Sequence, residues 1–411
     1  MPTNLNDPTS NTRYFTAATM LSKLAAAGTD VNSVQPIPYF ENLFPAWAGV
    51  ATQNILANET DSSGNPYSQT CAPGNLPANP TATQNVYEIW NCYAHNETLT
   101  LKYLDLPNSI NQFGTALPNS KLGPYAFYHD QFSSLFAWRN IGTSDYNGLQ
   151  VTYNARWGSN LQGQFNYTFS KSFDEASAAA RIGPYEGTGG TGNDLNGGGI
   201  VINSWDPLAL RGLSDFNAFN QFNANMVYQL PFGKGQRLLG NASPLVNAVL
   251  GGWHVSGIFR VTSGFPITID NGFTWATNWN IEGDAEPNGP APVASNPKNV
   301  VVNGVSGPDI FADPVAAEAA FRPEWPGESG VRNNVIGQGM FNLDTGVAKD
   351  FSLGEQRRVE FKWESFNATN SVRYDVRGAQ PSLSFDPSQF GRYVSTLTNA
   401  RFMQFSLRLA F

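Results

Sequence analysis

The sequence predicts an all-β fold of long antiparallel strands, and three observations support this prediction. Apolar and polar residues alternate with a period of two in several runs that are longer than the about 5–6 residues of an average strand. The 411-residue chain contains 28 Phe, 15 Tyr and 10 Trp, and aromatic residues are enriched in strands. Only 14% of its residues are charged, whereas soluble globular proteins average about 25%.

Seven strands are expected from this alternation. The first two flank a three-residue turn, Gly158–Asn160, and together they predict a β-hairpin. The alternation is sharpest in the sixth run, where charged residues separate Val359, Phe361 and Trp363. The expected strands cover residues 146–157, 161–172, 221–230, 253–262, 341–351, 358–366 and 400–411.

The connections between the strands alternate between long and short. Tight turns are expected around Gly158 and Gly354, and long loops over residues 173–214, 264–337 and 367–399. One end of the sheet should therefore carry elaborate loops and the other end short turns.

Three helices are expected outside the strands. The first covers residues 16–28 and ends at Gly28, and another covers residues 313–321. In the connection 231–252, Ser243 suits a helix cap and the proline that follows it suits the first helical position.

Alternation alone fits two architectures. A soluble β-sandwich buries its apolar face, whereas a transmembrane β-barrel exposes that face to lipid and keeps the polar face for its lumen. The strands have about the 9–11 residues that a tilted strand needs to cross the hydrocarbon layer. Trp157, Trp253 and Phe411 also fall on the apolar face at the short-turn end, as in the aromatic girdle of a barrel. The sequence therefore predicts part of an antiparallel transmembrane β-barrel.

Five stretches within residues 145–411 carry a resemblance to a known family. They include "SDYNGLQVTYNARWGSNLQGQFNYTFSKSFDEAS", "LGGWHVSGIFRVTSGFPITI", "FNLDTGVAKDFSLGEQRRVEFKWESFNATN" and the closing "NARFMQFSLRLAF". These stretches resemble the C-terminal barrel of TonB-dependent outer-membrane transporters, and are most similar to the Oar-like group with a carboxypeptidase-regulatory-like domain. The resemblance implies an outer-membrane receptor that takes up a bulky, scarce solute, such as a siderophore, an oligosaccharide or a peptide.

The resemblance also implies partners and a domain organisation. Seven strands are too few to close such a barrel, so we expect the chain to be the C-terminal portion of a longer protein. In this interpretation residues 1–144 are a long extracellular loop region and residues 145–411 are the barrel strands with their surface loops. The expected partners are outer-membrane lipid, the TonB complex through a segment before residue 1, the barrel-assembly machinery, and the solute.

The alternation assigns candidate residues to each face of the barrel. We expect eight side chains to face the lumen: Arg156, His254, Arg260, Arg358, Glu360, Lys362, Glu364 and Arg408. We expect six to face lipid: Trp157, Trp253, Phe405, Leu407, Leu409 and Phe411. By resemblance, the aromatic end of the last strand is also the signal that the barrel-assembly machinery reads.

Cys71 and Cys92 are the two cysteines of the chain. They lie in a loop-like stretch, and a disulfide in an oxidising compartment is the expected state. The alternative is two unrelated thiols.

No catalytic, cofactor or metal site is expected. The three histidines, His95, His129 and His254, lack the spacing of metal ligands, and no nucleophile triad is present. The formal net charge of −8 argues against a nucleic-acid partner. The alternative function is a secreted or surface β-rich protein that binds glycans or partners without spanning a membrane.

Aromatic residues in the expected loops have two interpretations. They stack on a sugar or chelate ligand, or they pack the loops against one another. The residues concerned are Tyr39, Phe40, Phe44, Trp47, Trp275, Trp279 and Trp325.

Overall fold

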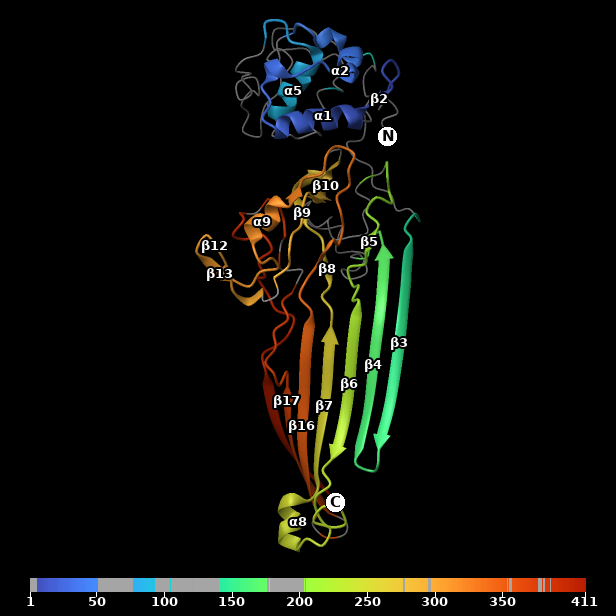
Figure 1. Ribbon diagram of the computed structural model, residues 1–411, viewed down its shortest axis with the longest axis vertical. Helices are drawn as coiled ribbons and strands as arrows, with labels where there is room; N and C mark the ends of the chain where they lie inside the picture. The colour runs from blue at the N-terminus through green and yellow to red at the C-terminus, as the bar shows by residue number, and fades with distance from the viewer. Residues whose placement is uncertain are drawn as a thin grey trace.

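The fold is known from a computed structural model of the chain. It describes residues 6–50, 77–92, 104, 121, 127, 140–175, 177, 203, 205–275, 278–294, 297–352, 354, 357–375, 379, 381–384 and 386–411. Three parts are visible along its long axis: a helical unit, a folded assembly of loops, and a sheet of long strands (Figure 1). Within these residues, no helix has the length and apolar character required to cross a membrane.

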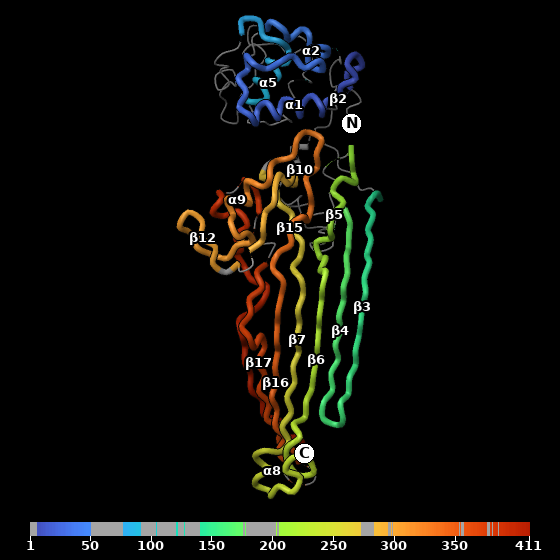
Figure 2. Tube along the Cα trace, viewed as in Figure 1, coloured from blue at the N-terminus to red at the C-terminus, as the bar shows by residue number. Residues whose placement is uncertain are grey.

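Seven long antiparallel strands form the main sheet, which confirms the predicted fold class. Each strand pairs with the long strand before it and the long strand after it, so that the chain runs up and down in order (Figure 2). A two-residue strand, β5 (Gly212–Leu213), extends the sheet beside β4. The long strands are β3 (Ser144–Trp157), β4 (Leu161–Asp174), β6 (Asn220–Gln229), β7 (Trp253–Thr262), β16 (Met340–Ser352), β17 (Arg358–Phe366) and β18 (Phe402–Ala410).

The two outer strands of this sheet are β3 and β18. Among the described residues no pairing joins them, so each presents one edge of unpaired backbone groups. Such an edge recruits a further strand wherever one is available.

The turns at one end of the sheet are compact. Gly158 has a φ of 63°, a left-handed conformation that costs glycine little, and it turns β3 into β4. Between β6 and β7 lies the expected helix, α8 (Pro244–Leu250). The Ser243 side chain caps it by accepting a hydrogen bond from the Val246 amide, as the sequence predicted.

The loops at the opposite end fold into a compact assembly, which we call the loop unit (residues 264–337 and 367–399). Phe311 and Phe390 stack at its centre with ring centroids 5.3 Å apart, and both are fully buried. Its helix α9 (Pro314–Ala319) lies within the expected range of residues 313–321, and the Asp313 side chain caps it by accepting a hydrogen bond from the Ala316 amide. Its other elements are β8 (Pro266–Ile267), β9 (Asp270–Trp275), β10 (Asn278–Asp284), β11 (Glu286–Pro287), η4 (Pro297–Asn299), β12 (Val300–Val302), β13 (Val305–Gly307), β14 (Phe321–Arg322) and β15 (Val335–Ile336).

The first part of the chain forms the helical unit (residues 6–50 and 77–92, with Leu104 and Phe127 against it). The helix expected over residues 16–28 is present as α1, and further helices follow it within the region that was expected to be a long loop. The elements are β1 (Asn6–Asp7), β2 (Thr12–Arg13), α1 (Tyr14–Ala26), η1 (Val31–Ser33), α2 (Pro38–Leu43), η2 (Pro45–Trp47) and α5 (Ala82–Cys92).

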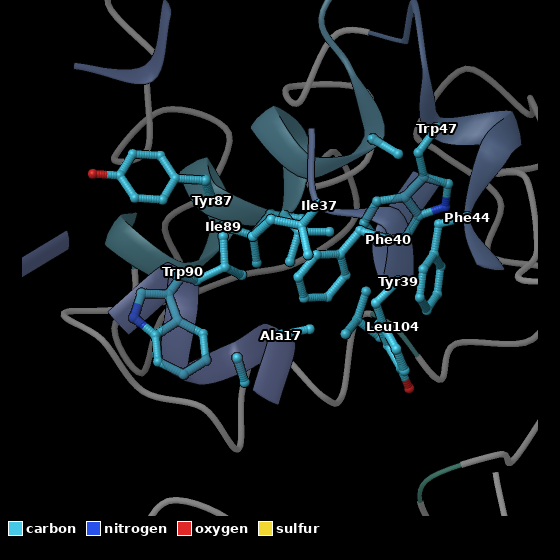
Figure 3. Close-up of a cluster of buried hydrophobic side chains, with 14 of the residues drawn as sticks. Ala17, Ile37, Tyr39, Phe40, Phe44, Trp47, Tyr87, Ile89, Trp90 and Leu104 are labelled. Carbon is cyan, nitrogen blue, oxygen red and sulfur yellow. The ribbon is translucent and has the colours of Figure 1, made fainter. Parts of the chain in front are cut away.

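Aromatic side chains form the core of the helical unit (Figure 3). Tyr39, Phe40, Phe44 and Trp47 are all buried in it, so for these four the packing interpretation is confirmed and stacking on a solute is wrong. The Asn85 side chain donates hydrogen bonds to the carbonyls of Trp47 and Val50. The loop sequence therefore packs as a small domain core does.

The helical unit touches the loops through α1. The ring of Phe15 meets that of Trp205 edge to face, with centroids 5.2 Å apart, and the same ring lies against Gly327. The Thr19 hydroxyl donates a hydrogen bond to the Pro326 carbonyl at 3.3 Å. One face of α1 is thus seated on the loop unit and on the connection before β5.

We predict that Phe390→Ala destabilises the loop unit by about 3–5 kcal/mol, because it removes a fully buried ring and leaves a cavity. Limited proteolysis should then cut within residues 264–399 faster than in the parent protein. Leu397→Ala is the matched control in the same segment, since Leu397 is exposed. Equal cleavage of the two variants would contradict the assignment of Phe390 to a core.

Candidate functional site

The register gives the sheet two faces of opposite character. Side chains alternate along a strand, and cross-strand partners lie on the same face. In one row Tyr153 pairs with Phe165, Phe165 with Ala224, and Ala224 with Phe259. In the neighbouring row Asn223 pairs with both Asn166 and Arg260. We call the two sides the apolar face and the polar face.

All eight side chains that were expected to line a lumen fall on the polar face. Glu360 is paired with Arg408 across β17 and β18. The Lys362 ammonium contacts the Glu364 carboxylate, which also accepts a hydrogen bond of 2.7 Å from Gln404. Arg156 lies on β3 at the other edge of the sheet, so the face brings together the charges of β17 and β18 but leaves Arg156 apart from them.

Asp350 belongs to this polar face, although sequence analysis did not select it. Its carboxylate lies 3.6 Å from Nε of Arg358 and 4.0 Å from Nδ1 of His254, so it joins two selected residues. The run around Asp350 alternates weakly, and only the pairing of Asp350 with Glu360 reveals its face.

The expected lipid-facing residues lie on the apolar face, and this face is largely uncovered. Phe405 and Leu407 are 70% and 73% exposed, and Phe411 follows β18 at the end of the chain. Trp157 and Trp253 lie at the turn end of β3 and β7. A soluble protein rarely exposes a continuous apolar surface of this kind. That the apolar face meets lipid and the polar face lines a lumen stays a prediction.

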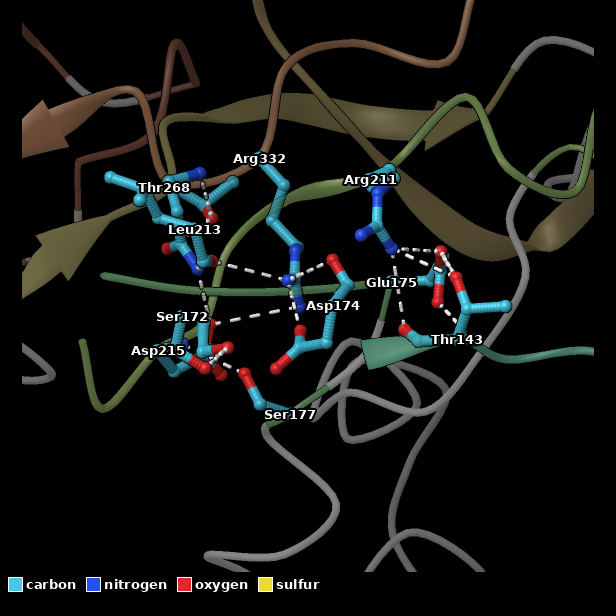
Figure 4. Close-up of polar contacts among 12 residues, drawn as sticks. Thr143, Ser172, Asp174, Glu175, Ser177, Arg211, Leu213, Asp215, Thr268 and Arg332 are labelled. Carbon is cyan, nitrogen blue, oxygen red and sulfur yellow. Dashed lines mark hydrogen bonds and ion pairs between the residues drawn. The ribbon is translucent and has the colours of Figure 1, made fainter. Parts of the chain in front are cut away.

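A buried polar cluster joins two loops at the far end of the sheet (Figure 4). The Arg332 guanidinium contacts the Asp174 carboxylate and donates hydrogen bonds to the carbonyls of Asp174 and Leu213, at 2.7 and 3.2 Å. The Asn333 side chain donates to Leu213 and Asp215. Arg332 and Asn333 thereby fix the loop unit to the end of β4 and to β5. This cluster could not be predicted from the sequence, because Arg332 and Asn333 are more than a hundred positions from their partners.

A second group of contacts lies beside this cluster in Figure 4. Arg211 contacts Glu175 at 2.9 Å and also the Asp145 carboxylate. The Thr143 hydroxyl donates to Glu175 at 2.7 Å. Burial acts to raise the pKa of Glu175, but the hydrogen bonds from Thr143 and the Arg211 charge together lower it below its usual value. Glu175 therefore remains ionised and holds the start of β3 near the loop that follows β4.

Carboxyl groups also gather inside the loop unit. Burial and the nearby charges of Glu324 and Asp270 raise the pKa of Asp284 to about 8. Burial raises the pKa of Glu324 to about 7, although Asn271 donates a hydrogen bond to it at 2.5 Å. Both groups lie where the β9–β10 hairpin meets the segment that carries Pro326 and Gly327.

Two further predictions concern cysteine and metal chemistry. Cys71 lies outside the described residues, so the disulfide with Cys92 stays a prediction, and His95 and His129 also lie outside them. Within the described residues no group of three or more His, Cys, Asp or Glu side chains could hold a metal ion. The side chains of Trp275 and Trp279 are likewise not described, whereas Trp325 stacks under the Arg322 guanidinium at 4.8 Å.

One family of known proteins is similar to this chain. The model of a family described as an outer membrane beta barrel domain matches residues 10–404. The match covers the helical unit from residue 10 onward, the whole loop unit, six complete long strands and the first residues of β18. No curated protein matches the chain, and no solved structure does.

Cysteine labelling tests the assignment of the two faces on adjacent residues of an inner strand. We predict that Ser256→Cys, on the polar face of β7, reacts with a membrane-impermeant maleimide in isolated outer membranes. Val255→Cys, on the apolar face, should react only with a lipid-soluble maleimide. Cys71→Ser and Cys92→Ser remove the background thiols. Equal labelling of both positions by the impermeant reagent would show that the assignment is wrong.

The carboxyl cluster predicts that the loop unit loses stability as pH rises. The raised pKa values of Asp284 and Glu324 mean that the folded state holds protons that the unfolded chain releases near pH 4. Their contribution is complete below that pH and is lost as pH rises through about 7 and 8. The rate of limited proteolysis of the loop unit should therefore increase from pH 5 to pH 9. The increase should exceed the change in the protease's own activity over this range, measured on an unfolded substrate.

The matched variants isolate this effect. Asp284→Asn removes one of the two carboxyls with a raised pKa and should weaken the pH dependence, since Glu324 still titrates. Asp313→Asn changes an aspartate of the same unit to another good helix cap and should preserve the full dependence. An undiminished dependence in Asp284→Asn would mean that other groups cause it.

Proposed function

We propose that the chain forms part of a TonB-dependent receptor. The premise is that the chain belongs to the outer membrane beta barrel domain family and is a protein of the outer membrane. In this proposal the receptor takes up a bulky, scarce solute across the outer membrane. The solute class is a siderophore, an oligosaccharide or a peptide. The protein acts by binding and passage and carries out no covalent chemistry.

The observation that carries this proposal is the separation of the two faces over all seven strands. The apolar face suits contact with hydrocarbon, where water is absent and side chains need no polar partner. The polar face, with its charges on β16, β17 and β18, suits a water-filled interior. A soluble glycan-binding protein would instead need to cover the apolar face, and the exposure of Phe405 and Leu407 argues against that alternative.

The folded loops support a receptor rather than a simple pore. A pore needs only connections between its strands, whereas this chain builds a loop unit and a helical unit, each with a core of its own. Rigid, packed loops can present a defined binding surface, because little conformational entropy is lost on binding. The resemblance of residues 145–411 to TonB-dependent transporters supports energised uptake.

The edges of the sheet fit a larger barrel. Unpaired backbone groups cost several kcal/mol each in hydrocarbon, so the edges of β3 and β18 require partners in a membrane. We propose that further strands of the same barrel pair with both edges. In this proposal the barrel-assembly machinery recognises β18 and the residues after it, and the TonB complex acts on a plug within the lumen.

Uptake in cells that carry the complete gene tests the function. Labelled ferric siderophores, oligosaccharides and peptides are offered to the parent strain, to a strain that lacks the gene, and to parent cells treated with a protonophore. We predict that accumulation of one solute class is lost in both the second and the third case. Accumulation that needs the gene but persists with the protonophore would indicate a passive pore and contradict TonB dependence.

A further inference from the structure

An unusual apolar surface lies at the turn end of the sheet. Helix α8 (Pro244–Leu250) has no buried residue. Leu245 is 82% exposed and Val249 is 65% exposed, and Val246 and Leu250 are also exposed. In proteins most helical stability comes from packing an apolar face, yet this apolar helix buries none of its large side chains among the described residues.

The surface continues into the turn that precedes the helix. Phe232, Leu238 and Leu239 are exposed there. The same turn contains Lys234 and Arg237, and residues 229–252 contain no Asp or Glu. This segment is therefore basic in a chain whose formal net charge is −8. We call residues 231–252 the foot.

Polar contacts fix the foot in place. Asn247, the single polar residue within α8, accepts a hydrogen bond from the Lys234 amide at 2.7 Å. The Lys349 ammonium donates to the Gly251 carbonyl. These contacts hold the backbone of the foot, while its apolar side chains remain exposed.

The foot is continuous with the apolar face of the sheet. Trp253 begins β7 on that face, and its indole Nε1 donates a hydrogen bond to the Val249 carbonyl at 2.8 Å. The helix also lies at the same end of the molecule as the C-terminus (Figures 1 and 2). A lipid layer or a partner that contacts the apolar face next to Trp253 would therefore also contact the foot.

We propose that the foot is a lipid-binding element, in which the apolar side chains of α8 insert into the membrane leaflet at the turn end and Lys234 and Arg237 bind phospholipid head-group phosphates. The proposal rests on the assignment of the apolar face to lipid. A segment that combines exposed apolar side chains with basic groups has the composition of elements that lie in a membrane interface. A protein partner is less well suited, since the foot adjoins the strand face that is assigned to lipid.

Spin labelling in isolated outer membranes tests the proposal on the full chain, with Cys71→Ser and Cys92→Ser as background. A nitroxide at Leu245→Cys should collide with oxygen, which concentrates in lipid, several-fold more often than with a water-soluble nickel chelate. Ser159→Cys, in the polar β3–β4 turn at the same end, should show the opposite preference. A Leu245 label as accessible to the nickel chelate as the Ser159 label overturns the proposal.

A carbonate wash separates lipid from a protein partner. Alkaline carbonate strips peripheral proteins from membranes and leaves the lipid, so the oxygen preference at Leu245 should survive it. A preference that disappears after the wash shows that a protein covers α8 and overturns the proposal. The pair Lys234→Gln and Arg237→Gln should lower the oxygen preference severalfold at low salt, since charge attraction is screened by salt. An unchanged ratio overturns the role of the two basic residues.

A nitroxide at Val255→Cys in the same membranes reports whether the apolar face of the sheet contacts lipid. It therefore separates a failure of the foot proposal from a failure of the face assignment that supports the proposed function. Lipid exposure at Val255 combined with water exposure at Leu245 overturns the foot alone. Water exposure at both positions overturns the assignment of the apolar face, and the foot with it.

Discussion

The unbroken antiparallel register from β3 to β18 is the constraint on which the rest of the structure depends. Side chains alternate between the two faces along each strand, so the register of the pairing decides the face of every side chain. A shift of one residue in any strand would move all the charges of that strand onto the apolar face. One row shows how far the parity holds: Val151 pairs with Tyr167, then Phe222, Val261 and Phe341 follow on successive strands. Each member of the row is apolar. The two faces are therefore a property of the sheet as a whole and not of single strands.

The fixed strand ends in turn decide how the loops fold. Loops that start from neighbouring strands are held side by side, and their backbone polar groups need partners wherever packing excludes water. Arg332 and Asn333 supply such partners to the Leu213 carbonyl, between segments that are distant in sequence. The hydrophobic cluster around Phe311 and Phe390 then completes a unit that sits on the sheet, and α1 of the helical unit rests on it through Phe15.

Local patterns predicted the strands and the start of α8, because both depend on residues close together in the chain. The period of two located β3 to β18, and Ser243 located the start of α8. The sequence left the burial of Tyr39 and its neighbours as one of two interpretations, because their burial depends on contacts with α5, beyond any local period. The link between Arg332 and Asp174 was not predicted either, since a single charge in a long loop gives no indication of its partner.

Two lysines lie on the apolar face, and their positions at its ends explain how it holds them. Lys171 and Lys349 occupy apolar-face positions by parity, paired with Asn147 and Trp253. Lys171 lies near the loop end of β4, and Lys349 lies opposite the first residue of β7, next to the foot. Each ammonium lies over an aromatic ring, at 4.5 Å from Phe173 and at 4.7 Å from Phe351. A lysine at the end of an apolar surface can pack the aliphatic part of its side chain on that surface while its ammonium group reaches polar groups beyond it. The two lysines thus mark opposite borders of the apolar face, and at the turn border Lys349 ties that face to the Gly251 carbonyl at the end of α8.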